Sequence, residues 1–188
     1  MDKGYRCHET SFGWMAVKAH PGFYTWEEAK IKCSEDGGEL PMPRSSIENN
    51  WFVDRANELG LGSFWLGVTD EEVEGTWNNQ NGLPQTYLNW ASRQPDNSGN
   101  NQDCVRTSGG YGYQWDDVPC NLKGFHLLCA YGEGKSTRSL GEELIWKSLK
   151  QRCSVYRGNE KYGLQPLCLN LQKQLLTVRE IPEVSRRF

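Results

Sequence analysis

The polar stretch at residues 78–112 constrains the fold of this chain more than any other feature. It is rich in Asn, Gly, Gln and Ser and holds few apolar residues. With more than thirty residues it is too long for an ordinary connection between secondary-structure elements. Long loops in compact domains tend to carry function. The stretch therefore predicts a small core that supports one unusually long functional loop.

Side chains with hard oxygen atoms gather in this stretch and just after it. Gln94-Pro95-Asp96 is followed by Gln102-Asp103-Cys104, and Trp115-Asp116-Asp117 comes shortly before Cys120. Calcium takes about six to eight oxygen ligands of this kind. The proline indicates a loop shaped for geometry, because it holds the preceding residue extended and permits a cis peptide bond. Two cysteines bracket the segment and could link its ends, so the sequence predicts an extracellular calcium site on a loop.

Length and charge narrow the class of protein. The chain has 188 residues, which suits one domain or one domain with an extension. Its formal net charge of -3 favours neither nucleic acid nor an anionic membrane as a partner. No apolar run approaches the roughly 20 residues that a membrane span needs. We therefore expect no nucleic-acid partner and no membrane span.

Cysteine usage indicates an oxidising compartment. The seven cysteines form no Cys-x-x-Cys pair, so a zinc site has little support, and scattered cysteines in a small domain indicate disulfides. The odd number leaves at least one thiol unpaired or paired between chains. Residues 1–6 lack the apolar stretch of a signal peptide, which indicates either a fragment boundary or an unusual route of secretion. The cysteines favour the first, and we expect a secreted or extracellular protein. They are Cys7, Cys33, Cys104, Cys120, Cys129, Cys153 and Cys168.

Two capping boxes, at residues 25–28 and 45–48, predict the N-termini of two helices. Gly37-Gly38 is expected to end the first helix and Gly60 the second. Apolar residues at helical spacing predict the buried faces, which are Trp26, Ala29 and Cys33 in the first helix and Ile47, Trp51, Phe52 and Leu59 in the second.

Extended structure is predicted before, between and after these features. Residues 1–24 are expected to be extended, and 64–68, 75–77, 118–120 and 126–131 are expected to be strands. Four tryptophans are expected to be core or loop anchors, because large aromatic side chains dominate burial. They are Trp65, Trp77, Trp90 and Trp115.

The character of the chain changes after Tyr131. Residues 132–139 are typical of a linker, and weak helical periodicity follows at 142–156 and 164–178. The tail from Arg179 is expected to be disordered. We find neither a repeat nor any catalytic chemistry in this extension.

An ordered set of short motifs carries a resemblance to a known family. The motifs are Trp26-x-x-Ala29-x-x-x-Cys33, Gly38-x-Leu40, Ser46-Ile47-Glu48-Asn49, Trp65-Leu66-Gly67-Val68, Glu74-Gly75-x-x-Trp77, Asn89-Trp90, Gln94-Pro95-Asp96, Asp103-Cys104-Val105, Trp115-Asp116-Asp117, Pro119-Cys120 and Cys129. In this order and spacing, the chain resembles the C-type lectin-like domain over about residues 5–131. Residues 1–131 are thus expected to form that domain, and 132–188 an extension of unknown role.

The resemblance implies an α+β fold of the double-loop type, with two helices, two small antiparallel sheets and a long calcium and ligand loop. It also implies disulfides Cys33–Cys129 and Cys104–Cys120. Cys7 lies near the first cysteine of an optional N-terminal hairpin in the family, but the partner expected near Gly22 is missing. Cys7 therefore stays unassigned, as do Cys153 and Cys168, which could form a bridge within the extension.

The resemblance further implies a set of calcium ligands that also bind sugar. Two adjacent sugar hydroxyls would complete the coordination of the ion and hydrogen-bond to the side chains that hold it. An auxiliary calcium site is also implied, although its acidic residues 70–74 are equally typical of a solvated turn. The principal ligands are Gln94, Asp96, Gln102, Asp116 and Asp117, and the auxiliary ones are Asp70, Glu74, Asn97, Gln102 and Asp103.

Two positions depart from the family pattern. Gln102 stands where the family usually has Glu, and Asp116 where it usually has Asn, so the number of carboxylates is kept and calcium binding is expected. Gln-Pro-Asp is linked in the family with galactose-like sugars. In this chain, however, the amide and the acid exchange places in both pairs, Gln94 with Asp96 and Gln102 with Asp116. Exchanging both would restore the relative pattern of the mannose class in reversed order. Residues 97–101 lack the aromatic side chain of many galactose binders, and Tyr111 or Tyr113 could replace it.

These features predict a binding domain and no enzyme. The three histidines are scattered, and no nucleophile and base stand at a catalytic spacing. The leading hypothesis is a calcium-dependent lectin domain that recognises galactose-like glycans, in defence against microbes or in recognition of self. A matrix or biomineral component, or a metal-free domain that binds a protein, is the alternative. Single sites of this kind bind weakly, so clustering in a homo-oligomer would supply avidity.

Overall fold

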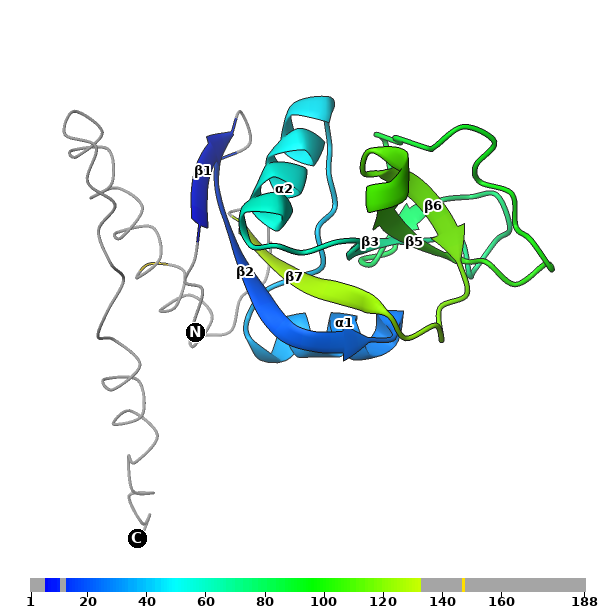
Figure 1. Cartoon of the computed structure of the whole chain (residues 1–188), viewed down its shortest axis with the longest axis horizontal. Helices are drawn as coiled ribbons and strands as arrows, with labels where there is room; N and C mark the ends of the chain where they lie inside the picture. The colour runs from blue at the N-terminus through cyan, green and yellow to red at the C-terminus, as the bar shows by residue number, and fades with distance from the viewer. Residues whose placement is uncertain (1–5, 11–12, 133–146, 148–188) are drawn as a thin grey trace, which may run out of the picture.

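The computed structural model describes residues 6–10, 13–132 and 147. These residues form two α-helices and two small antiparallel sheets, which confirms the expected α+β class (Figure 1). Apart from residue 147, the helices predicted at 142–156 and 164–178 lie outside the described residues, as does the pairing of Cys153 and Cys168. The elements are β1 (Arg6–Thr10), β2 (Gly13–Tyr24), α1 (Trp26–Glu35), α2 (Ser46–Glu58), β3 (Trp65–Thr69), β4 (Asn78–Asn79), β5 (Cys104–Ser108), the 3-10 helix η1 (Gly109–Tyr111), β6 (Gln114–Val118) and β7 (Phe125–Gly132).

The first sheet brings the two ends of the domain together. Its strand order is β1-β2-β7, and β7 runs antiparallel to β2 from the pair Met15 and Gly132 to the pair Tyr24 and Phe125. The second sheet has the order β4-β3-β5-β6. The extended structure expected over the first residues is therefore present as β1 and β2 within the described range.

The two helices cover opposite faces of β2 and β7, as Figure 1 shows. Along β7, Leu127 and Cys129 belong to the cluster that holds α1, whereas Leu128 belongs to the cluster that holds α2. This alternation follows from the two-residue period of a strand. Burying side chains of this size stabilises the fold by about 1.5–3 kcal/mol each.

Helix α1 begins as the sequence predicts. Thr25 Oγ1 accepts the backbone N–H of Glu28 at 3.3 Å, and Glu28 Oε2 accepts the backbone N–H of Thr25 at 2.9 Å. The expected face is buried, with Trp26, Ala29 and Cys33 all in the core. The capping box and the apolar face thus both predict the helix that the structure contains.

Helix α2 departs from its prediction in two ways. Ser45 does cap it, but the Glu48 carboxylate turns back to the backbone and guanidinium of Arg44, so the predicted box is only half formed. Ile47 is 71% exposed and the prediction of its burial was wrong. Glu48 is buried instead, at 2% exposure, because the buried face centres on Glu48, Phe52 and Ala56. Ile47 lies about 100° around the helix from Glu48.

The strand predictions for the second sheet were partly wrong. Strand β3 matches the expected 64–68 within one residue, but residues 75–77 are not a strand: Gly75 ends the turn after β3, and the short β4 begins only at Asn78. Strand β6 ends at Val118, so 118–120 is not a strand. Strand β5 lies inside the polar stretch that was expected to be loop, because its polar residues gain their strand conformation by pairing with β3 and β6.

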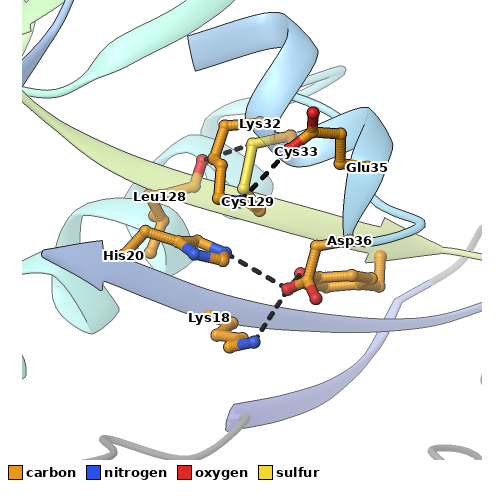
Figure 2. Close-up of a disulfide and its surroundings, with 9 residues drawn as sticks. Lys18, His20, Lys32, Cys33, Glu35, Asp36, Leu128 and Cys129 are labelled. Atoms are coloured by element: carbon orange, nitrogen blue, oxygen red, sulfur yellow. Dashed lines mark hydrogen bonds and ion pairs between the residues drawn. A yellow bond between two sulfur atoms is a disulfide. The ribbon is translucent and has the colours of Figure 1, made fainter. Parts of the chain in front are cut away.

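Both disulfides that the resemblance implies are formed. Cys33–Cys129 joins α1 to β7 (Figure 2), and Cys104–Cys120 joins β5 to the turn after β6. The first closes a chain separation of 96 residues and the second one of 16. In the chain-entropy account, loops of these sizes gain about 4.7 and 3 kcal/mol of stability.

A polar cluster lies near the first disulfide, where α1 ends. Figure 2 shows Lys18 and His20 of β2 reaching Asp36, with Lys18 Nζ at 2.8 Å and His20 Nε2 at 3.2 Å from Asp36 Oδ2. Tyr131 also donates its hydroxyl to this oxygen at 2.7 Å. Burial alone would raise the pKa of Asp36, but His20, Lys18 and Tyr131 outweigh it and hold that pKa well below its usual value. The carboxylate thus ties α1 to the sheet.

Among the described residues, no helix has both the length and the apolar character needed to cross a bilayer.

Candidate functional site

The long loop runs from β4 to β5 over residues 80–103 and projects from the second sheet, at the end of the domain away from β1 (Figure 1). Tryptophans hold it to that sheet. Trp90 lies between Trp77 and Trp115, with ring centroids 4.7 and 5.9 Å away. The Ala91 N–H also donates to the Trp115 carbonyl at 2.8 Å. Trp65 and Trp115 are fully buried and the other two half-buried, as expected of anchors.

The Gln94–Pro95 peptide bond is cis, and Arg93 and Asn97 on either side have positive φ angles of 70° and 39°. The Gln94 side chain is turned inward at this bend. Its Oε1 is buried and meets no hydrogen-bond donor in the part of the chain that the structure describes. An unsatisfied buried acceptor costs about 1–3 kcal/mol. This oxygen is therefore available to a cation or a donor that the protein itself does not supply.

Asp117 anchors the backbone that follows the cis proline. It is completely buried on β6. Its Oδ1 accepts the N–H of Asp96 at 3.0 Å, and its Oδ2 accepts the N–H of Asn97 at 2.7 Å. Hydrogen bonds from backbone amides to a carboxylate are among the stronger ones in proteins. Asp117 therefore places a carboxylate under the loop and sets the position of residues 96 and 97.

Asp96 and Gln102 meet at a single backbone amide. The N–H of Ser98 donates to Asp96 Oδ1 at 3.1 Å and also to Gln102 Oε1. The backbone N–H of Gln102 donates in turn to Asn97 Oδ1 at 3.1 Å. Three of the five predicted principal ligands, Asp96, Gln102 and Asp117, are thus gathered around the amides of residues 96–98.

Asp116 has a different environment. Successive residues of a strand point to opposite faces, so Asp116 points away from the face that Asp117 occupies. Its cross-strand neighbour is Arg106 on β5, whose Nε and Nη2 lie 3.1 and 2.5 Å from Asp116 Oδ2. Arg106 could not be predicted as part of the site from the sequence. The signal is its register opposite Asp116, which only the pairing of β5 with β6 reveals.

The residues proposed for an auxiliary calcium site lie between the turn after β3 and the loop. Asn97 Nδ2 donates to Glu74 Oε2 at 2.6 Å, and the N–H of Asp70 donates to the Asp103 carbonyl at 3.1 Å. Asp70 Oδ2 accepts the N–H of Gly75 at 2.8 Å. Asp70 Oδ1 is buried and has no partner within the described ranges.

The electrostatics around Asp70 are those of a site with surplus negative charge. Burial raises the pKa of Asp70, the hydrogen bond from Gly75 opposes that rise, and the charges of Glu74 and Asp103 add to it. A nearby cation would relieve both the burial of the carboxylate and the repulsion among these acids.

The donor chemistry of both residue sets fits calcium. Every contributing atom is a carboxylate or amide oxygen, and Gln94 Oε1 and Asp70 Oδ1 are buried oxygens without partners among the described residues. No three Asp, Glu, His or Cys side chains in that part of the chain converge as a metal-binding group. A calcium ion here would therefore depend on the amide oxygens of Gln94 and Gln102 as well as on carboxylates.

Comparison with protein families gives one match over most of the domain. The family described as the Lectin C-type domain matches residues 23–131. A tetranectin-like protein of Carcharhinus perezii is 33% identical over 131 residues, which cover 69% of this chain and 75% of that protein. Pulmonary surfactant-associated protein D of Bos taurus is 33% identical over 110 residues, 58% of this chain but only 29% of its own length.

Solved structures show the same architecture. The mouse scavenger receptor C-type lectin carbohydrate-recognition domain is 26% identical, with a TM-score of 0.58 over 70% of this chain and 97% of its own. A calcium-independent type II antifreeze protein is 25% identical, with a TM-score of 0.59 over 70% of this chain and 94% of its own. Both agree with an arrangement of two helices and two small sheets.

Proposed function

The chain belongs to the C-type lectin domain family, and on that premise we propose that its long loop binds galactose-like glycans with the help of calcium. Domains of this family bind ligands and are not enzymes. The observation that carries the proposal is the buried Gln94 Oε1, which has no hydrogen-bond donor among the described residues. This oxygen belongs to the loop that the buried Asp117 holds in place. The ligands would be Gln94, Asp96, Gln102 and Asp117, and Asp116 would join them only when its carboxylate turns from Arg106 toward the loop.

The burial of these side chains suggests a division of roles. Bound calcium would supply a positive centre for two sugar hydroxyls. Asp96 is exposed and would accept a hydrogen bond from a hydroxyl, and the half-buried Gln94 and Gln102 amides would donate one each. Asp117 is completely buried, so it would hold the loop and the ion and not touch the sugar.

The preference for galactose rests on Gln94-Pro95-Asp96, and the two tyrosines expected to replace the missing aromatic side chain differ in their surroundings. The Tyr113 hydroxyl donates to Asn57 at 2.5 Å, so this ring serves the packing of the domain. Tyr111 in η1 is 53% exposed. Tyr111 is therefore our candidate for the ring that stacks on the apolar face of the sugar.

We also propose a second calcium ion at Asp70, Glu74, Asn97 and Asp103, which Gln102 adjoins. The buried Asp70 Oδ1 and the raised pKa of this carboxyl support it. Isothermal titration with calcium alone should give two ions per chain. A stoichiometry of one, unchanged in the Asp70→Asn variant, would leave the acidic turn without a metal role.

The decisive experiment is affinity chromatography of the full chain on immobilised galactose, followed by a calcium-titrated glycan array. Galactose or a chelator should elute the protein, and mannose should not. Retention in the presence of chelator would contradict the role of calcium. Elution by mannose or fucose alone would reverse the sugar preference.

The proposed setting is extracellular. The two disulfides of the described residues suit an oxidising compartment, and calcium modules outside cells work at Kd of about 10⁻⁴–10⁻³ M. Single sites of this type bind weakly, so we propose that a homo-oligomer supplies avidity. Light scattering of the full chain tests this directly.

A second candidate function is a metal-free domain that binds a protein or a mineral surface. Two observations favour it: the similarity to a calcium-independent antifreeze protein, and the ion pair that occupies Asp116. A partner that binds equally with calcium and with chelator, together with an empty glycan array, would establish this alternative.

A further inference from the structure

Arg106 is held in one place by its surroundings. It stands directly across β5 and β6 from Asp116, and two of its nitrogens lie within hydrogen-bond distance of the same carboxylate oxygen. The guanidinium carbon also lies 4.5 Å from the ring centroid of Phe125, over the face of a buried aromatic side chain. Stacking on an aromatic ring together with a charge-assisted contact fixes the orientation of an arginine.

Asp116 depends on this arginine. Its side chain is 9% exposed, and a carboxylate buried to this degree without a partner is strongly disfavoured. Among the described residues, Arg106 is the cation in ion-pair contact with it. The pair therefore gives the Asp116 carboxylate a fixed partner when no metal is bound.

The same carboxylate belongs to the proposed calcium ligands. Of those five side chains, Asp96, Asp116 and Asp117 carry the negative charge, and the Arg106 guanidinium cancels one charge of the three. Calcium affinity depends on the number of charged ligands, and like charges at close range repel. A calcium ion that uses Asp116 must therefore displace the guanidinium or share the carboxylate with it.

We propose that Arg106 is an internal counter-ion that competes with calcium for Asp116 and thereby weakens the calcium affinity of the loop. This inference rests on the proposed function. It gives the site two states, one in which the arginine neutralises Asp116 and one in which calcium does. The first keeps the second sheet and the base of the loop intact without metal, and the second forms only where calcium is abundant.

The test measures calcium affinity by isothermal titration of the full chain with calcium chloride alone. Arg106→Gln should bind calcium at least about tenfold more tightly than the natural chain. Without calcium, its melting temperature should fall, because Asp116 loses its partner. Arg93→Gln is the matched control: it removes an equal charge beside Gln94, at an exposed side chain with no ion pair to Asp116. It should change the affinity less than about twofold.

A double-mutant cycle with Asp116→Asn makes the test specific. In the Asp116→Asn background, Arg106→Gln should change the calcium affinity less than about twofold, because the contested carboxylate is gone. If Arg106→Gln does not fold, Arg106→Met keeps an unbranched stem against Phe125 without the charge and should show the same tightening. Equal affinities in the natural chain and the folded Arg106 variant, or equal gains in the Arg93 control, overturn the inference.

The outcomes separate this inference from the proposed function. Calcium binding by the natural chain with no gain in the Arg106 variant rejects the inference and leaves the calcium role of the loop standing. Binding only by the Arg106 variant supports the inference and shows that the natural chain does not use calcium. Absence of calcium binding in both chains overturns both. Retention on galactose is measured separately in each chain.

Discussion

Asp36 and Asp70 are two aspartates in opposite environments, and they represent the two halves of the domain. Asp36, where α1 ends, has Lys18, His20 and Tyr131 around it, and its pKa lies well below the usual value. Asp70, just after β3, is buried with one oxygen unpartnered among the described residues, and its pKa is raised. The first carboxylate is satisfied by the protein, whereas the second is not.

This difference extends beyond the two residues. In the half built on α1 and the β1-β2-β7 sheet, the Asp36 carboxylate has partners within the protein, and the Cys33–Cys129 disulfide joins α1 to β7. In the half built on β3 to β6, unpartnered oxygens and repelling acids collect around the loop. Since unsatisfied buried groups lower stability, we infer that the second half keeps them for an external partner. Five variants test this difference between the two halves, in order of decreasing expected effect.

The largest expected effect is on the disulfides. Replacing Cys33 and Cys129 together by Ser should lower the free energy of unfolding by about 4–5 kcal/mol, because a long chain segment is released. Replacing Cys104 and Cys120 together should cost about 3 kcal/mol, and it should also weaken calcium binding, since that bridge joins β5 to the turn after β6. Urea denaturation with and without calcium measures both. If the first pair weakens calcium binding as much as the second, the two halves are not separate in function.

Asp117→Ala should produce the next largest effect. It removes the acceptor of the Asp96 and Asn97 amides, at a cost of about 3 kcal/mol without calcium. It should also abolish retention on galactose and the part of the thermal stabilisation by calcium that comes from the principal site. Asp54→Ala, at an exposed position of α2, is the control and should change neither. Sugar binding that survives in Asp117→Ala would show that the proposed site is wrong.

The contrast between the halves also marks what could be predicted from the sequence. Helix α1 was predictable because its cap and its apolar face are local signals. The burial of Glu48 was not, because it depends on Arg44 turning its guanidinium onto that carboxylate. Strand β5 was missed because Arg106, Thr107 and Ser108 are polar, and strand formation there follows from pairing with distant segments.

In the candidate site, the loop residues were predictable from a local motif and its resemblance to a family. Their environment was not. That Asp117 bonds the loop while Asp116 meets Arg106 follows from the alternation of β6 and from its register with β5. Register is set by the whole sheet, so a count of carboxylates along the sequence overstates the charge available to calcium.

Asp36→Asn should destabilise the protein by about 1 kcal/mol at pH 7, a figure that allows for the partial exposure of this carboxyl. Because the pKa of Asp36 is lowered by folding, its stabilising contribution is complete above the unfolded pKa of about 3.9 and is lost as pH falls further. The difference in melting temperature between the natural chain and the variant should therefore shrink below about pH 4. A constant difference down to pH 2 would mean that the carboxylate charge is not what Lys18 and His20 stabilise.

Asp70→Asn should have the smallest effect and the opposite sign. Folding raises the pKa of Asp70, so its contribution favours the folded state below the unfolded pKa and is lost as pH rises through the folded pKa. At pH 7 in chelator the neutral variant should thus be more stable, by about 0.5–1 kcal/mol, and at pH 3 the two proteins should have the same melting temperature.

The asparagine side chain of this variant can still accept the Gly75 N–H, and its amide N–H group can donate to the neighbouring acids Glu74 and Asp103. With calcium the order should reverse, because the natural chain gains a ligand charge that the variant lacks. A variant that is less stable than the natural chain in chelator would place Asp70 with Asp36, as a carboxylate that the fold itself satisfies, and would remove the ground for a cation in this half.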